Sequence, residues 1–158
     1  MMSRARILHR TSPSTVAANS IVSSQLDVQT TGMGFFDVTA EVAAFLRDVG
    51  GQEGMVTAFI RHTSASLTIQ ENADPSVLDD LTTVLDRLAP QKAGWTHDLE
   101  GPDDMPAHIK TMLTSVSLTV PVLAGELALG TWQAIYLVEH RKAPHRRQIV
   151  LQFCGRTT

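Results

Sequence analysis

The sequence predicts a single α+β domain with a mixed, mainly antiparallel sheet packed with two to three helices. The predicted elements run strand, helix, strand and helix, followed by a series of strands. Short corners that contain Gly or Pro separate these last strands, which favours antiparallel pairing. Of the 158 residues 43% are hydrophobic and 18% are charged, a composition that suits one hydrophobic core.

The first predicted strand, Ile21–Thr30, follows a segment of different composition. Residues 1–20 contain three arginines and no acidic residue, and they lack the apolar region of a secretory signal. A short transit peptide has a similar composition, but Pro13 would break its helix. We predict a flexible extension over residues 1–20 and one domain over residues 21–158.

The first predicted helix begins at Asp37 or Thr39 and ends at Val49, where two glycines follow. The β-branched and aromatic stretch Met55–Ile60 then predicts a buried strand, which leads into a polar loop. Six further elements, two helices and four strands, follow this loop in the predicted order.

The second helix begins at Asp74, because Asp suits the N-cap position and Pro75 suits the first helical position. It ends before Pro90, and its apolar stripe is predicted to belong to the core. A short helix follows over Met105–Leu113. The remaining chain predicts four strands: Ser115–Val122, Glu126–Leu129, Thr131–Glu139 and Gln148–Phe153.

The segment between the second and third helices is the strongest candidate for a functional site. Residues 97–110 contain two histidines, three aspartates, one glutamate and one lysine. A solvated acidic turn is the alternative interpretation. Histidine is a common ligand of zinc, so His97 and His108 favour a metal site, together with His62 at the end of an earlier strand. Magnesium is the other candidate, because it prefers carboxylates such as those of Asp103 and Asp104.

Several cationic and hydroxyl side chains near these segments could bind a phosphorylated substrate, although surface ion pairs would explain the cations equally well. The candidate residues are Arg61, Ser64, Lys110, Arg146 and Arg147. Ser64 lies near His62 but lacks the glycines of a nucleophile elbow. His140 and His145 are predicted to lie in a solvated hairpin, and Trp132 with Gln133 could shape a pocket floor or a subunit interface.

The composition bears on three further questions: nucleic-acid binding, membrane spans and cellular compartment. The net charge of −3 and the pI near 6.0 give no reason to expect nucleic-acid binding. No apolar stretch has the length of a membrane span. Cys154 is the only cysteine, which favours a reducing compartment, and we expect the cytoplasm.

Taken together, these stretches resemble the YjbQ family, also called secondary thiamine-phosphate synthase enzymes. The resemblance covers about Val22 to Gln152. The matching residues are His62–Pro75, Asp103-Asp104, Ala107–Lys110, Val120-Pro121, Gly125–Leu127 and Leu129–Gln133.

The resemblance implies a homotrimer with a polar, metal-binding pocket near the subunit interface, in which His62, His97 and His108 are the motif histidines. It also implies a weak thiamine-phosphate synthase activity, in which a hydroxymethylpyrimidine diphosphate is joined to a thiazole phosphate. The chain departs from the commonest family pattern in a longer stretch over residues 101–108. It departs again at His140–His145, where an acidic, glycine-containing turn is more usual.

On this basis the residues receive expected roles. Metal or substrate ligands are expected to be His62, His97, Asp103, Asp104 and His108, with a divalent ion, zinc or magnesium, as cofactor. Phosphate is expected to bind Arg61, Ser64, Lys110 and Arg146, and the residues expected to orient the histidines are Glu71, Asn72 and Gln133. Two alternatives remain: a non-catalytic trimeric protein that binds a metal or metabolite, and a metal-dependent hydrolase of a phosphorylated metabolite.

Overall fold

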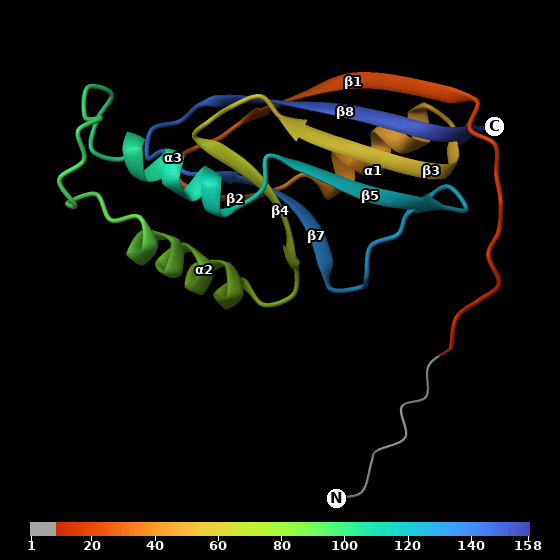
Figure 1. Ribbon diagram of the computed structural model, residues 1–158, viewed down its shortest axis with the longest axis horizontal. Coiled ribbons are helices and arrows are strands. Elements are labelled where there is room, and N and C mark those ends of the chain that lie inside the picture. The colour runs from red at the N-terminus through yellow and green to blue at the C-terminus, as the bar shows by residue number, and fades with distance from the viewer. Residues whose placement is uncertain (1–8) are drawn as a thin grey trace, which may run out of the picture.

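A computed structural model describes residues 9–158 as three helices and eight strands (Figure 1). The helices are α1 (Thr39–Asp48), α2 (Pro75–Leu88) and α3 (Asp104–Leu113). The strands are β1 (Ser20–Gln29), β2 (Gly34–Asp37), β3 (Gly51–Ile60), β4 (Ala65–Glu71), β5 (Ser117–Leu123), β6 (Glu126–Leu127), β7 (Gln133–Glu139) and β8 (Arg146–Thr157).

The strands form two sheets, and every pairing between them in the described residues is antiparallel. The larger sheet has the order β1-β8-β3-β5-β6, and the smaller sheet has the order β2-β7-β4. Strands β3 and β8 approach very closely at Gly54 and Gly155, which face each other in the register. A Cβ atom on Gly54 would lie 2.2 Å from the carbonyl oxygen of Cys154, so only glycine fits there.

Both sheets share one hydrophobic core with helix α1. The apolar side of α1 contributes Val42 and Leu46, which are buried with Phe153 of β8. The smaller sheet contributes Leu67 of β4 and Leu137 of β7 to the same cluster. Helices α2 and α3 lie outside this core, at the end of the molecule opposite the C-terminus (Figure 1). The loops at that end carry the polar residues of interest.

Helix α2 begins as predicted: the side chain of Asp74 accepts a hydrogen bond from the Ser76 backbone N–H, at 2.9 Å. The predicted burial of its apolar stripe is wrong, because no residue of α2 is buried in the single chain. Val84 is 47% exposed and Leu88 is 59% exposed. The helix extends along the outside of the molecule, so its hydrophobic pattern indicates a surface that the single chain does not cover.

The predicted α+β class and its mainly antiparallel pairing are confirmed, with small differences in the elements. Strands β2 and β4 were not predicted, since β2 has only four residues and β4 shows no alternation of buried and exposed side chains. Part of the predicted extension, residues 1–8, lies outside the described residues, and residues 9–19 form no helix or strand. Within residues 9–158, no helix is both long enough and apolar enough to cross a bilayer.

Candidate functional site

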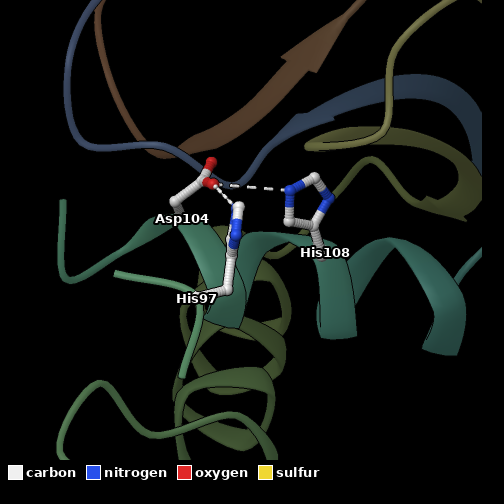
Figure 2. Close-up of side chains that lie close together, drawn as sticks. All are labelled: His97, Asp104 and His108. Carbon is white, nitrogen blue, oxygen red and sulfur yellow. Dashed lines mark hydrogen bonds and ion pairs between the residues drawn. The ribbon is translucent and has the colours of Figure 1, made fainter. Parts of the chain in front are cut away.

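Three predicted ligands come together at the start of α3 (Figure 2). Asp104 and His108 are four residues apart on this helix, so their side chains lie on the same face. His97 reaches them from the loop that precedes the helix. One ligand atom from each of the three side chains lies within 4.8 Å of the others. We call this group, His97, Asp104 and His108, the α3 cluster.

The hydrogen bonds of His108 fix which of its ring nitrogens is free. Its Nδ1 lies 2.9 Å from the carbonyl oxygen of Thr63, which can only accept, so Nδ1 carries a proton and donates. In neutral His108 the lone pair is therefore on Nε2, which lies 3.4 Å from Oδ2 of Asp104. Two acceptors then face each other, an arrangement that a cation or an extra proton between them would stabilise. A carbonyl that holds the remote N–H is also the usual support of a metal-binding histidine.

The second histidine approaches the same carboxylate oxygen. Nε2 of His97 lies 2.7 Å from Oδ2 of Asp104, and the two imidazole rings are 5.5 Å apart between centroids. Asp104 is 2% exposed, whereas the side chains of His97 and His108 are 46% and 34% exposed. The carboxylate thus lies at the base of the cluster, and the imidazoles line its open side. Two imidazoles and one carboxylate with an open side suit a transition metal that also binds a substrate or water.

Arg141, from the loop between β7 and β8, holds the other side of the cluster and was not predicted. Its Nη1 donates to Oδ1 of Asp104, its Nε donates to Oδ2 of Asp103 at 3.3 Å, and its Nη2 donates to the carbonyl of Glu100 at 2.7 Å. One guanidinium thus fixes three groups at the start of α3. The proximity of Arg141 to the cluster depends on tertiary packing, and no spacing in the sequence indicates it.

Asp103 has a supporting position. Its Oδ2 accepts hydrogen bonds from Arg141 and from the Lys142 backbone N–H, at 2.8 Å. Burial favours a higher pKa for Asp103, but these hydrogen bonds and the Arg141 charge outweigh it and lower the pKa. Asp103 is not among the side chains whose ligand atoms come together in the α3 cluster, so within one chain it does not occupy its predicted place as a ligand; it anchors the β7–β8 loop through Arg141 and Lys142.

His62 does not join the α3 cluster, contrary to its predicted role as a third histidine ligand. Its Nε2 accepts a hydrogen bond from the Gln148 backbone N–H, at 3.0 Å, so the proton is on Nδ1. Burial lowers the pKa of His62, and the Arg147 charge adds to this effect. His62 and Arg61 instead line a cavity of about 470 Å³. Thr63, which holds His108, lines the same cavity, so the cavity adjoins the α3 cluster.

Two of the four predicted phosphate ligands, Lys110 and Arg146, are engaged away from this cavity, whereas Arg61 and Ser64 line it. Lys110 is 3% exposed, and its Nζ lies 2.5 Å from Oδ1 of Asp86. Arg146 pairs with Asp27 on the exposed side of β8 and β1, at 2.8 Å. The hydroxyl of Ser64 accepts a hydrogen bond from Arg147, at 3.1 Å. Of the four, Arg61 is the exposed cation in the cavity beside the cluster.

The residues predicted to orient the histidines lie at the far end of the smaller sheet. Glu71 pairs with Gln133 in the register of β4 and β7, whereas Ala65 pairs with Glu139 near the cluster. Six residues of strand separate the two positions, which corresponds to about 20 Å. The Asn72 side chain donates to the carbonyl of Thr131, at 3.3 Å, and not to a histidine. Within one chain, Glu71, Asn72 and Gln133 therefore lie away from the histidines of the α3 cluster.

A buried polar network around Glu139 holds the backbone of the loops that surround the cluster. Glu139 is fully buried, and its two carboxylate oxygens accept from Nε and Nη2 of Arg147, each at 2.6 Å. It also accepts from the Thr30 hydroxyl and from the Arg141 backbone N–H, each at 2.9 Å. Burial favours a higher pKa for Glu139, but the Arg147 hydrogen bonds outweigh it and lower the pKa. This network fixes the backbone from which the Arg141 side chain reaches Asp104.

His140 belongs to this buried layer, so its predicted place in a solvated hairpin is wrong. It is 2% exposed, and its Nε2 lies 2.9 Å from the hydroxyl of Ser66, which is also buried. Burial lowers the pKa of His140 to about 4, and the nearby charge of Lys110 adds to the effect.

Stability is therefore expected to fall as the pH falls from 6.5 towards 4. In this window the unfolded chain protonates residue 140, whose ordinary pKa is 6.5, while the folded chain keeps it neutral. The difference in pKa corresponds to about 3 kcal/mol of unfolding free energy. Urea unfolding at several pH values would measure it, with His140→Gln as the matched variant that does not titrate. Equal pH dependence in the two proteins would contradict the prediction.

Comparisons with known proteins agree with this architecture. A family model described as UPF0047 protein YjbQ-like matches residues 24–156. A UPF0047 protein of Synechocystis is 44% identical over 131 residues, which covers 82% of this chain and 89% of that protein. A UPF0047 protein YjbQ of Salmonella typhimurium is 43% identical over 123 residues, 77% of this chain and 89% of that protein. The crystal structure of a hypothetical protein from Aeropyrum pernix K1 superposes with a TM-score of 0.79 at 30% identity, and covers 85% of this chain and 99% of that one.

Proposed function

This chain belongs to the YjbQ-like UPF0047 family, and we propose that its α3 cluster binds a divalent metal ion at which a phosphorylated metabolite reacts. The observation that supports the proposal best is the placement of His108. The Thr63 carbonyl fixes its protonated Nδ1, so the Nε2 lone pair faces the buried carboxylate of Asp104. This geometry suits a cation held between the two groups.

The proposed ligands are His97, Asp104 and His108. Zinc fits this donor set better than magnesium, because two of the three ligands are imidazoles. A bound ion of this type acts as a Lewis acid and offsets negative charge on phosphate oxygens. The positive charge of Arg141 offsets part of the negative charge of Asp104, and the hydrogen bond between them keeps the carboxylate at the base of the cluster.

The proposed reaction is the coupling catalysed by thiamine-phosphate synthases. The thiazole nitrogen forms a bond to the methylene carbon of the pyrimidine, the bond from that carbon to the diphosphate breaks, and the diphosphate leaves with the electron pair. The chain's contribution would be to bind the leaving group and to exclude water. Arg61 is the cation in place for the phosphates, and the Nδ1–H of His62 is a neutral donor in the same cavity.

The test combines metal analysis with a coupling assay on the purified protein. We expect about one transition metal ion per chain, and equal amounts of thiamine phosphate and diphosphate from the two substrates. Hydrolysis of simple phosphate esters without coupling would assign the site to a metal-dependent hydrolase and contradict the synthase proposal. Bound metal without turnover of either substrate class would contradict both the synthase and the hydrolase hypotheses.

A specific observation favours the non-catalytic alternative, a protein that binds a metal or metabolite without turnover. Lys110 and Arg146 are paired with Asp86 and Asp27, so they do not face the cavity beside the cluster. Two substrates with several phosphate groups would then meet few cations from one chain. The coupling assay described above separates this alternative from the synthase.

The proposal includes a homotrimer in the cytoplasm. The apolar stripe of α2 supports the assembly, because Val84 and Leu88 are exposed in the single chain and an interface between copies would cover them. The single cysteine supports a reducing compartment.

Light scattering is expected to give three times the 17.2 kDa mass of one chain. Replacement of Leu88 by Glu should shift this mass towards one chain, whereas Leu99→Glu, at an exposed position outside α2, should not; a wild-type mass of 17.2 kDa would contradict the trimer.

A further inference from the structure

A separate cavity lies between helix α1 and the hairpin of β5 and β6. Its volume is about 340 Å³, within the usual range for a small-molecule site. We call it the α1 pocket; the residues that line it are Thr39, Ala43, Leu46 and Arg47 of α1, and Gly125, Glu126, Leu127 and Leu129. The four helical residues share one face of α1, which extends about 12 Å along the helix axis. No residue of this pocket belongs to the α3 cluster or lines the cavity beside it.

The middle of the α1 pocket is apolar. Leu46 is 1% exposed and belongs to the hydrophobic core, and Leu127 and Leu129 pack against the same core. Ala43 has the smallest side chain on this face of the helix, so space remains between α1 and the hairpin. A hydrocarbon group that enters this space leaves water and contacts these side chains, which favours its binding.

The tip of the hairpin is fixed against the segment that follows α1. The backbone N–H of Gly125 donates to the carbonyl of Gln52, at 2.9 Å, and the backbone N–H of Ala124 donates to Oε1 of Glu53, at 3.0 Å. Ala124 has a φ of 51°, a conformation that residues other than glycine rarely adopt. Because Gln52 lies only four residues beyond the end of α1, the hairpin tip is at the C-terminal end of that helix.

Two opposite charges lie at this end of the pocket. Arg47 is in the last turn of α1, and Glu126 directly follows the glycine of the hairpin tip. Both side chains are exposed, and among residues 9–158 they form an ion pair neither with each other nor with another side chain. A head group with one negative and one positive charge can therefore bind between them without displacing an existing pair.

We infer that the α1 pocket binds an α-amino acid with an apolar side chain. Such a molecule carries both charges at one end and hydrocarbon at the other, as the pocket does. Its carboxylate pairs with Arg47, its ammonium group pairs with Glu126, and its side chain lies over Ala43 among the leucines. In the absence of a ligand, Arg47 has only the carbonyl groups at the end of α1 to interact with.

The test is an NMR titration of the ¹⁵N-labelled protein at pH 7.5 with L-leucine and with two analogues that each lack one charge. 4-Methylpentanoate lacks the ammonium group, and 3-methylbutylamine lacks the carboxylate. Leucine is expected to bind more tightly than either analogue and to shift the backbone signals of Ala43 and Gly125. The signals of His97 and His108 serve as the reference for the α3 cluster, because an amino acid that coordinated a metal ion there would shift them instead.

Two charge variants assign the ends of the ligand. Arg47→Gln is expected to weaken the binding of leucine and 4-methylpentanoate by about three- to fivefold, the usual size of an exposed ion pair, and not that of 3-methylbutylamine. Glu126→Gln should weaken the binding of leucine and 3-methylbutylamine by a similar factor, and not that of 4-methylpentanoate. The matched control is Arg87→Gln, which removes an exposed arginine from the last turn of α2, outside the pocket, and should change none of the affinities.

A third variant fills the apolar part of the pocket. Ala43→Leu keeps both charges and a good helix former, and it should weaken the binding of leucine at least tenfold because its side chain occupies the space of the ligand. Unchanged affinity in this variant, or leucine that binds no more tightly than both analogues, would overturn the inference. Shifts confined to His97 and His108 would also overturn it, and would leave the proposed metal site intact. None of the expected shifts depends on whether the α3 cluster binds metal.

Discussion

Replacement of His108 by alanine is expected to weaken metal binding at the proposed site by about 100-fold or more, so that the purified variant contains no metal ion. The imidazole is one of the three proposed ligands in the α3 cluster, and the Thr63 carbonyl already holds it in the tautomer that metal binding requires. A site reduced to His97 and Asp104 loses both a donor and a fixed geometry. Elemental analysis and titration with zinc would measure the change.

The matched control for this prediction is His145→Ala, which removes an imidazole from outside the cluster. Nδ1 of His145 is bonded to the Ala143 carbonyl, at 2.7 Å, so this variant loses a hydrogen bond but no proposed ligand. Circular dichroism would verify that both variants are folded. Retention of one metal ion per chain in the His108 variant would contradict the assignment of the α3 cluster. Loss of metal should also abolish any coupling activity, whereas His145→Ala should retain both.

Replacement of Glu139 by glutamine is expected to lower the unfolding free energy by about 3–5 kcal/mol, the cost of leaving a buried charge without its partner. Both carboxylate oxygens accept from the Arg147 guanidinium, and glutamine turns one of them into an NH₂ group that faces other donors. Arg147 is 4% exposed, so water cannot replace the lost acceptor without local opening. Equilibrium unfolding in urea would measure the difference.

Two further variants make this prediction specific. Glu126→Gln, at an exposed position, should change the unfolding free energy by less than about 0.5 kcal/mol. The double variant Glu139→Gln with Arg147→Met should recover part of the loss, because the unpaired charge is removed with its partner. A Glu139→Gln protein within about 1 kcal/mol of the wild type would show that the pair does not stabilise the fold, a result that solvent access to Arg147 would produce.

The sequence predicts most elements of this fold because their signals are local. The Asp74-Pro75 start of α2 and the two glycines after α1 are determined by backbone chemistry within one turn. The burial of α2 was not predictable in the same way, because an amphipathic pattern shows that a face must be covered but not which molecule covers it. The exposed Leu88 illustrates the difference.

In the candidate site, too, the residues that are close in the sequence could be predicted and those that are distant could not. His97, Asp104 and His108 lie within twelve residues of each other, so their clustering could be predicted from one loop and one helix. Arg141 reaches them from the loop between β7 and β8, and its contribution depends on the packing of segments that are distant in the sequence. For His140 the local pattern was misleading. A polar stretch with lysine and proline is typical of a surface hairpin, but His140, the first residue of that stretch, is buried.

The strand order has a consequence for the way this chain is made. Among residues 9–158, strand β1 pairs with β8 alone, and β8 lies between β1 and β3 in the larger sheet. Ser20 and Gly155 are therefore neighbours although more than a hundred residues separate them along the chain. During synthesis β1 leaves the ribosome long before its only partner, and it remains an unpaired strand until almost the whole chain has emerged. The larger sheet can then be completed only after β8 has emerged, and we expect this pairing at long sequence separation to be slow.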